Sequence, residues 1–237
     1  MSKKIILFSA IIGIFACCVS CTFPIMIKGN GNLITSEKTV SEFEKINISG
    51  SAEVRFHASQ EYRAVVTVDE NLDEYVEVVT RGDRLYIGTK SGSYSFTKYL
   101  VDVYCPALTG VSVSGSGSFK NTDKITVSTF ETSVSGSGRI EGIIDCENFS
   151  SRISGSGKMI FAGNVKNAEI GISGSGKFEG DEFIVNDATV RISGSGKIDV
   201  HVTNNLKASI SGSGKINYRG EPKIESNISG SGSIRKM

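Results

Sequence analysis

The sequence predicts an all-β protein folded as a right-handed parallel β-helix, a solenoid in which each coil of chain stacks on the coil before it. Three observations support this. The tetrapeptide Ser-Gly-Ser-Gly recurs seven times at intervals of 18 to 21 residues, the length of one solenoid coil. Apolar residues flank every copy, and side chains between copies alternate with the period of a β-strand. The copies begin at Ser114, Ser135, Ser154, Ser173, Ser193, Ser211 and Ser229.

Each regular coil is expected to run strand, Ser-Gly-Ser-Gly corner, strand and a second, more variable corner. The residue before each tetrapeptide is β-branched, from Val113 to Ile228, and such residues favour strands. Five positions after the first serine lies a large apolar residue, from Phe119 to Ile234. One coil cannot bury this face alone, whereas coils stacked about 4.8 Å apart bury it in one continuous core. Glycine fits the corner because it accepts positive φ and close backbone approach.

Three alternatives fit the repeat less well. A flexible Gly/Ser linker has no reason to keep apolar residues on both flanks of seven copies. A calcium-binding nonapeptide β-roll needs a recurring aspartate in its turn, and none of the tetrapeptides contains one. A left-handed hexapeptide helix requires an aliphatic residue every six positions, whereas the observed spacing drifts and suits the right-handed form better.

Residues 1–20 are expected to be a signal peptide of the lipoprotein type. Two lysines precede an apolar run of twelve residues, which is too short to span a membrane. A small residue followed by cysteine is typical of bacterial lipoproteins, in which that cysteine is lipidated. Cys21 after Ser20 is the preferred attachment site and Cys17 after Ala16 is the alternative. An ordinary cleaved signal with incidental cysteines stays open.

The next two segments lack the tetrapeptide. Residues 21–39 are polar and rich in turn residues, and we expect a linker from the lipid anchor. Residues 40–110 keep a strand pattern, which predicts irregular coils with one or two hairpins, one helical turn over 69–75, and a degenerate corner at Ile48-Ser49-Gly50-Ser51. Residues 111–237 form the regular part of the same continuous domain. Strands are predicted in the irregular half over 46–48, 52–56, 64–68, 76–79, 85–87 and 101–104.

Composition limits the partners and cofactors. The net charge is +1, from 26 basic and 25 acidic residues, which gives no bias toward nucleic acid or an anionic membrane. Histidine occurs only at His57 and His201, so no metal site and no cofactor are expected. Cys105 and Cys146 are predicted to be free, buried thiols, because the repeat register separates them by about 9–10 Å, beyond the reach of a disulfide.

Segments outside the repeat carry a family resemblance. They are Phe43-Glu-Lys-Ile46, Val66-Thr-Val-Asp-Glu-Asn-Leu72, Leu85-Tyr-Ile87 and Cys105-Pro-Ala-Leu-Thr-Gly-Val111. Together with the tetrapeptides they resemble the DUF2807 family, also called the putative auto-transporter adhesin, head GIN domain, over roughly residues 28–237. The resemblance implies a right-handed β-helix in a cell-envelope protein typical of Bacteroidetes lipoproteins. It brings no established catalytic residues.

One outward position carries a cation in five consecutive coils. Two residues further on, Glu141, Glu179 and Asp199 face the same way. Like charges about 5 Å apart repel by about 1 kcal/mol in water, and interleaved carboxylates relieve part of that. The hypotheses are a ladder that keeps the protein soluble, or a ridge that binds an anionic glycan or another envelope polymer. The cations are Arg139, Lys158, Lys177, Lys197 and Lys215.

A polar loop at 91–99 carries the aromatic residues Tyr94, Phe96 and Tyr99. Exposed rings can stack on sugars, and the alternative is that these rings cover the flank of the solenoid. The enzyme alternative is a polysaccharide lyase or hydrolase, which needs clustered carboxylates. No catalytic site is expected, because the aspartates of the coils fall at different registers. These aspartates are Asp123, Asp145, Asp181 and Asp187.

The sequence therefore predicts a non-catalytic lipoprotein of the cell envelope, on the periplasmic or the surface face of the outer membrane. Its ectodomain is expected to be an adhesin-like binding or spacer module that contacts polysaccharide or a surface protein. The alternatives are the β-helix enzyme and a ligand-free structural periplasmic protein. Because solenoid ends are open strand edges, the last coil is expected to pair end to end with another copy or to be protected by Arg235 and Lys236.

Overall fold

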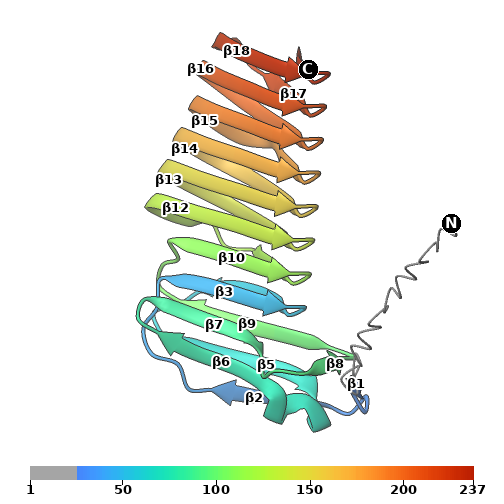
Figure 1. The fold of residues 1–237 in the computed structure, drawn as a ribbon. Coiled ribbons are helices and arrows are strands. Elements are labelled where there is room, and N and C mark those ends of the chain that lie inside the picture. The colour runs from blue at the N-terminus through green and yellow to red at the C-terminus, as the bar shows by residue number, and fades with distance from the viewer. Residues whose placement is uncertain (1–25) are drawn as a thin grey trace, which may run out of the picture.

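The computed structural model describes residues 26–237 and confirms the predicted β-solenoid (Figure 1). In Figure 1 the front strands run from left to right while the chain rises toward the C-terminus, which makes a right-handed helix. The predicted signal peptide and both candidate lipid-attachment residues, Cys21 and Cys17, lie outside the described residues.

The elements of the described chain are almost all strands. They are β1 (Met26–Lys28), β2 (Leu33–Lys38), β3 (Lys45–Gly50), β4 (Glu53–Ala58), β5 (Arg63–Asp69), the 3₁₀ helix η1 (Glu70–Tyr75), β6 (Val76–Arg81), β7 (Arg84–Thr89), β8 (Ser93–Ser95), β9 (Tyr99–Cys105), β10 (Gly110–Gly115), β11 (Ser118–Asn121), β12 (Ile125–Gly136), β13 (Arg139–Gly155), β14 (Lys158–Gly174), β15 (Lys177–Gly194), β16 (Lys197–Gly212), β17 (Lys215–Arg219), β18 (Lys223–Gly230) and β19 (Ser233–Lys236).

The strands form two long faces with the core between them. Along the first face the order is β6, β7, β3, β10, β12, the second halves of β13 to β16, and β18. Along the second face it is β2, β5, β9, β4, β11, the first halves of β13 to β16, β17 and β19. Pairing is parallel except for β6–β7, β2–β5 and β5–β9. The antiparallel strands therefore gather at the irregular end.

The register predicted from the tetrapeptide is found in the sheet. Gly155 pairs with Gly136 in the coil before and with Gly174 in the coil after. The degenerate corner aligns in the same way, because Ser49 pairs with Ser114 and Gly50 with Gly115. Each corner also bonds to the next, since the backbone N–H of Ser156 donates to the Gly136 carbonyl at 2.9 Å.

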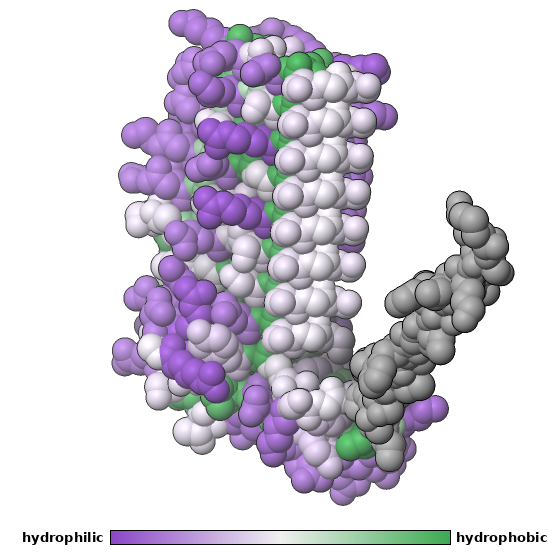
Figure 2. Space-filling model, in the orientation of Figure 1, coloured by the Kyte–Doolittle hydropathy of each residue, from purple (hydrophilic) through white to green (hydrophobic). Residues whose placement is uncertain are grey.

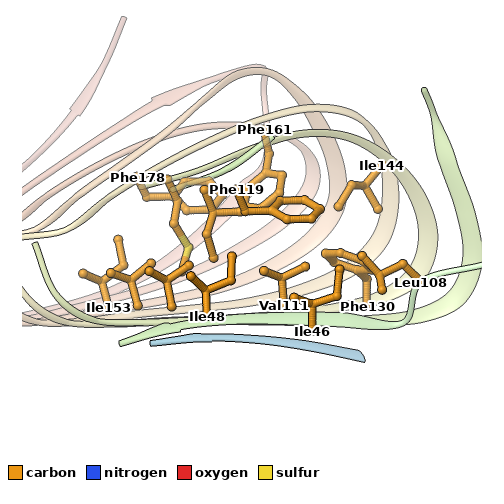
Figure 3. Packing of buried hydrophobic residues seen from close by; sticks show 14 of the residues in the cluster. Ile46, Ile48, Leu108, Val111, Phe119, Phe130, Ile144, Ile153, Phe161 and Phe178 are labelled. Atoms are coloured by element: carbon orange, nitrogen blue, oxygen red, sulfur yellow. The ribbon is translucent and has the colours of Figure 1, made fainter. Parts of the chain in front are cut away.

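The core is built from rows of side chains that point inward from the two faces. Figure 3 shows Ile48 and Ile153 in the layer from the first face, opposite Phe119 and Phe178 from the second. Two polar residues in the interior, Thr132 and Ser151, donate to the Met159 thioether at 3.5 and 2.9 Å. No buried side-chain polar atom in the described chain lacks a hydrogen-bond partner. The interior rows fill the core, so the outer faces carry the solvent-exposed side chains.

The segment expected to be a linker needs correction where the structure describes it. Strands β1 and β2 lie within residues 21–39 and pair with β8 and β5. The turn between them is fixed by Asp69, whose carboxylate accepts the backbone N–H groups of Gly31 at 2.9 Å and Thr97 at 2.8 Å. A Cβ at Gly29 would collide with this carboxylate. The Gly- and Asn-rich composition therefore marks a fixed turn, not a flexible tether.

The other details predicted for the irregular half agree with the structure. The six predicted strands overlap β3, β4, β5, β6, β7 and β9, and η1 is the predicted helical turn. Cys105 and Cys146 are both free, but only Cys105 is fully buried, and Cys146 is half-buried. Burial raises the pKa of Cys105 to about 12 and that of Cys146 to about 11. Both thiols are therefore protonated and poorly nucleophilic at neutral pH.

Candidate functional site

The five predicted cations form one charge ladder on the outside of the second face. Arg139 pairs with Lys158, and Lys177 pairs with both Lys158 and Lys197. Lys215 follows on β17. The row of cations begins at Arg139, because the paired residue one coil earlier is the uncharged Ser118, and the residue before that is Glu53 of β4. The structure thus brings the predicted residues together at the spacing of adjacent coils.

Carboxylates on the same face compensate most of this charge ladder. Glu179 lies between two rungs, 2.8 Å from Lys158 and in an ion pair with Lys177. Lys197 binds Asp199 at 2.7 Å, and Arg139 binds Glu141. Among the described residues, Lys215 is the rung without an ion pair. An anionic polymer bound here would have to compete with carboxylates that the protein already supplies.

The pKa shifts along the ladder report the same pairing. Burial would raise the pKa of Glu179, but the hydrogen bonds from Lys158 and Lys177 outweigh it and hold that pKa below its ordinary value. The hydrogen bond to Glu179 raises the pKa of Lys177. Both groups therefore stay charged near neutral pH.

The three predicted aromatic residues lie together, but largely against the solenoid. The rings of Phe96 and Tyr99 are 4.7 Å apart and those of Tyr75 and Tyr94 are 5.0 Å apart, measured between centroids. Tyr99 is 6% exposed and donates its hydroxyl to the Gly88 carbonyl at 2.6 Å. Burial raises its pKa further above the ordinary value. Tyr94 and Phe96 are half-buried, so they are the members that a ligand can reach.

A groove of about 440 Å³ crosses β13 to β16 beside a row of amide and carboxylate side chains. Within this row the side-chain N–H of Asn167 donates to Asn148 at 3.0 Å, and that of Asn205 donates to Asp187 at 2.6 Å. Many of the polar atoms therefore already bond between coils. This row stabilises the second corner of each coil, and it leaves fewer groups free for a ligand.

A second groove, of about 580 Å³, lies on the other face and is lined by carboxylates and by Ile143, which is 41% exposed. Its carboxylates include Glu141, Glu179 and Asp181. The first two belong to the ion pairs described above, and Asp181 lies 3.6 Å from Arg219. The hydrogen bonds from Lys158 and Lys177 hold the pKa of Glu179 below its ordinary value, so this carboxylate stays ionised, which does not suit a general acid.

A third groove, of about 440 Å³, lies on the first face where the irregular coils meet the regular ones. We call it the tyrosine groove. Its walls come from β6, β7, β3, β10 and β12, and Tyr86 contributes its aromatic ring. The guanidinium of Arg81 lies 5.4 Å from the centre of that ring. The sequence did not indicate this groove, because the pairing of β7 with β3 joins segments that share no repeat.

Two further properties concern only the described residues. They contain no group of three or more His, Cys, Asp or Glu side chains arranged to hold a metal ion. Among their helices, none has the length and apolar composition needed to cross a membrane.

His57 binds Asp102 at 2.9 Å and stacks on Tyr104, with ring centroids 4.8 Å apart, on the second face.

Known proteins share both the sequence pattern and the fold. A family model for DUF2807, described as putative auto-transporter adhesin, head GIN domain, matches residues 42–222. A solved structure from Parabacteroides distasonis, named a putative lipid binding protein, is 31% identical over 90% of this chain and 99% of its own, with a TM-score of 0.75. No curated protein matches the chain.

Two solved structures named putative adhesins are also similar. The one from Parabacteroides merdae is 25% identical over 90% of this chain and 99% of its own, with a TM-score of 0.73. The one from Bacteroides fragilis has a TM-score of 0.85 but is only 23% identical, over 89% of this chain and 100% of its own. The latter supports the fold alone.

Proposed function

The chain belongs to the DUF2807 family of putative auto-transporter adhesins with a head GIN domain, and we propose that it is a non-catalytic, adhesin-like binding module of the cell envelope. The observation that carries the proposal is the division of the solenoid into a filled apolar core and two long polar outer faces. A stiff rod of this kind suits contacts with an extended partner, such as a polysaccharide or a surface protein.

The proposal includes a lipid anchor at Cys21, with Cys17 as the alternative. Strand β1 begins at Met26 at the irregular end of the solenoid. Five residues of chain reach at most about 18 Å, so a lipid on Cys21 would hold this end near the outer membrane. The regular coils, with the charge ladder, would then point away from the bilayer. That orientation suits a binding or spacer role.

Lipidation can be tested by growing cells expressing the chain with labelled palmitate. We expect label in the parent protein and in the Cys17→Ser variant, and none in Cys21→Ser, which should also leave the membrane fraction. Label that persists in Cys21→Ser and disappears in Cys17→Ser would move the anchor to the alternative residue. Absence of label from the parent protein would refute the lipoprotein proposal.

The charge ladder provides the test of binding to an acidic polymer. The triple variant Lys158→Gln, Lys177→Gln and Lys197→Gln removes three adjacent cations from the proposed ridge. If the ridge binds an anionic glycan, the triple variant should migrate freely in a native gel containing polygalacturonate, which should retard the parent chain. The triple variant Lys98→Gln, Lys166→Gln and Lys223→Gln, at exposed lysines of other rows, serves as the charge-matched control. Equal retardation of parent and triple variant would remove the ridge from the proposal.

A further inference from the structure

We propose that the tyrosine groove binds a chain of neutral sugar residues. This inference rests on the proposed adhesin-like function and names the class of partner for one site. The groove lies at the junction between β6–β7 and the first regular coils and has a volume of about 440 Å³. Its lining combines one aromatic ring, short hydroxyl side chains and a pair of opposite charges.

The apolar part of the groove is formed by Tyr86 and Val79 on adjacent antiparallel strands. Tyr86 is half-buried, and Val79 is 38% exposed, which is high for an aliphatic residue within a paired strand. The C–H groups on one side of a sugar ring carry partial positive charge and pack against the electron-rich face of an aromatic ring. The guanidinium of Arg81 lies over one face of the Tyr86 ring, 5.4 Å from its centre, so a sugar would have to pack on the opposite face.

The polar part of the groove suits hydroxyl groups. Ser133 and Ser112 lie on neighbouring coils and bond to each other at 2.9 Å through their hydroxyls. Ser133 uses its hydroxyl proton on Ser112, so Ser112 keeps a proton to donate and both oxygens can accept hydrogen bonds from sugar hydroxyls. Glu77 and Arg81 both line the groove, so a strongly charged polymer of either sign would meet one like charge. The lining therefore favours a neutral ligand.

The backbone of the groove leaves a peptide little to bind. Strands β7, β3 and β10 are each paired on both edges. A peptide that adds a strand to a sheet needs a free edge, so recognition over these strands has to use side chains. The groove also reaches Ser114 and Ser135, the first serines of two corners. From there an uncharged stripe of corners runs along the solenoid (Figure 2), along which a polymer could continue.

The experiment compares variants of the full chain by native gel electrophoresis in mannan, arabinoxylan and laminarin, which are neutral polysaccharides. We expect retardation by at least one of them. The Tyr86→Ala variant should weaken it about tenfold or more, and Tyr86→Phe should retain it because the ring remains. Tyr104→Ala is the matched control, since Tyr104 also stacks with an arginine, Arg63 at 4.3 Å, but lies on the other face.

A second variant guards against loss of folding. Ser112→Tyr fills the groove from a half-exposed position and should abolish retardation with an unchanged melting temperature. Retardation that survives both Tyr86→Ala and Ser112→Tyr would overturn this site while leaving the adhesin-like function standing. Retardation by no neutral polysaccharide would overturn the site as well. Retardation by polygalacturonate alone would overturn the site but support the proposed function through the charge ladder.

Discussion

The corner of each coil requires glycine at two positions for two different reasons. The first glycine has positive φ, 113° at Gly155, and an added Cβ would lie 2.7 Å from the Gly136 carbonyl of the coil before. The second glycine, such as Gly157, packs against the β-branched side chain of the preceding coil, Val134. Glycine therefore recurs at both corner positions along the chain, because the first requires a positive φ and the second requires close stacking of neighbouring coils.

The first testable prediction concerns Gly155. Replacement by alanine forces a side chain into a left-handed backbone conformation and against a carbonyl, so we expect a loss of about 1–3 kcal/mol in the free energy of unfolding. The measurement is the urea midpoint followed by circular dichroism. Ser156→Ala, at the exposed next position, should change the midpoint little. An unchanged midpoint for Gly155→Ala would contradict the corner geometry.

A second residue-scale prediction follows from Asp69, which is fully buried. Burial would raise the pKa of this carboxyl, but hydrogen bonds from Thr97, Gly31 and Lys98 outweigh it and hold the pKa below the ordinary 3.8. A group with a lowered folded-state pKa contributes stability above its unfolded pKa, and that contribution disappears as the pH falls through the folded-state pKa. The parent protein should therefore lose stability below about pH 4.

Asp69→Asn separates this contribution from general acid denaturation. The amide cannot accept all the hydrogen bonds of the carboxylate, so the variant should be less stable by about 1–3 kcal/mol at pH 7. Since the amide does not titrate, the gap between variant and parent should narrow as the pH falls below 4. Urea midpoints at pH 7, 5, 4 and 3 measure it. A difference in stability between parent and variant that stays constant with pH would show that the charge of Asp69 does not contribute to stability.

At the scale of elements, parallel stacking of similar coils places like charges beside each other, and carboxylates in the charge ladder reduce the resulting repulsion. Lys158 and Lys177 occupy paired positions on adjacent strands, and Glu179 binds both. We predict that Glu179→Gln lowers the stability by up to about 1 kcal/mol at low salt, because the two lysines then repel without compensation. The difference should shrink in 0.5 M NaCl through screening. Thermal melts at both salt concentrations test this, with Glu182→Gln as control.

The elements also show what the sequence could and could not predict. The regular coils were predictable because every coil has an apolar residue directly before its tetrapeptide, as Val134 is, and another five residues after the first serine, as Ile140 is. The register of the strands therefore follows from counting residues between tetrapeptides. Strands β1 and β2 were missed because their order depends on a distant carboxylate, Asp69. The tyrosine groove was missed for a similar reason, since only the pairing of β7 with β3 brings Tyr86 near Ser112.

At the scale of the whole molecule, the two ends of the described solenoid differ. At the irregular end the outermost strands pair antiparallel, and Leu72 of η1 is 0% exposed. At the other end, Ile224 and Ile228 of β18 are 44% and 43% exposed. Their partners one coil earlier, Leu206 and Ile210, are only 1% and 2% exposed. The core thus reaches solvent at one end of the described chain.

The last prediction follows from this difference between the ends. The β18–β19 end presents a parallel edge with exposed apolar side chains, so self-association should join two copies by this end through a two-fold axis. We expect sedimentation velocity to show a dimer that becomes monomeric in Ile228→Lys. Ile184→Lys, at a residue 39% exposed on the side of the rod, should leave the dimer intact.

The alternative predicted from the sequence is that Arg235 and Lys236 protect the edge of a monomer. These side chains lie on β19 in the last coil, where Lys236 binds Glu221. The two possibilities differ in hydrogen exchange, because a paired β18 would have backbone N–H groups protected by the second copy, whereas a free edge would exchange quickly. A monomer whose β18 amides exchange freely would therefore exclude end-to-end pairing and leave charge as the protection of this edge.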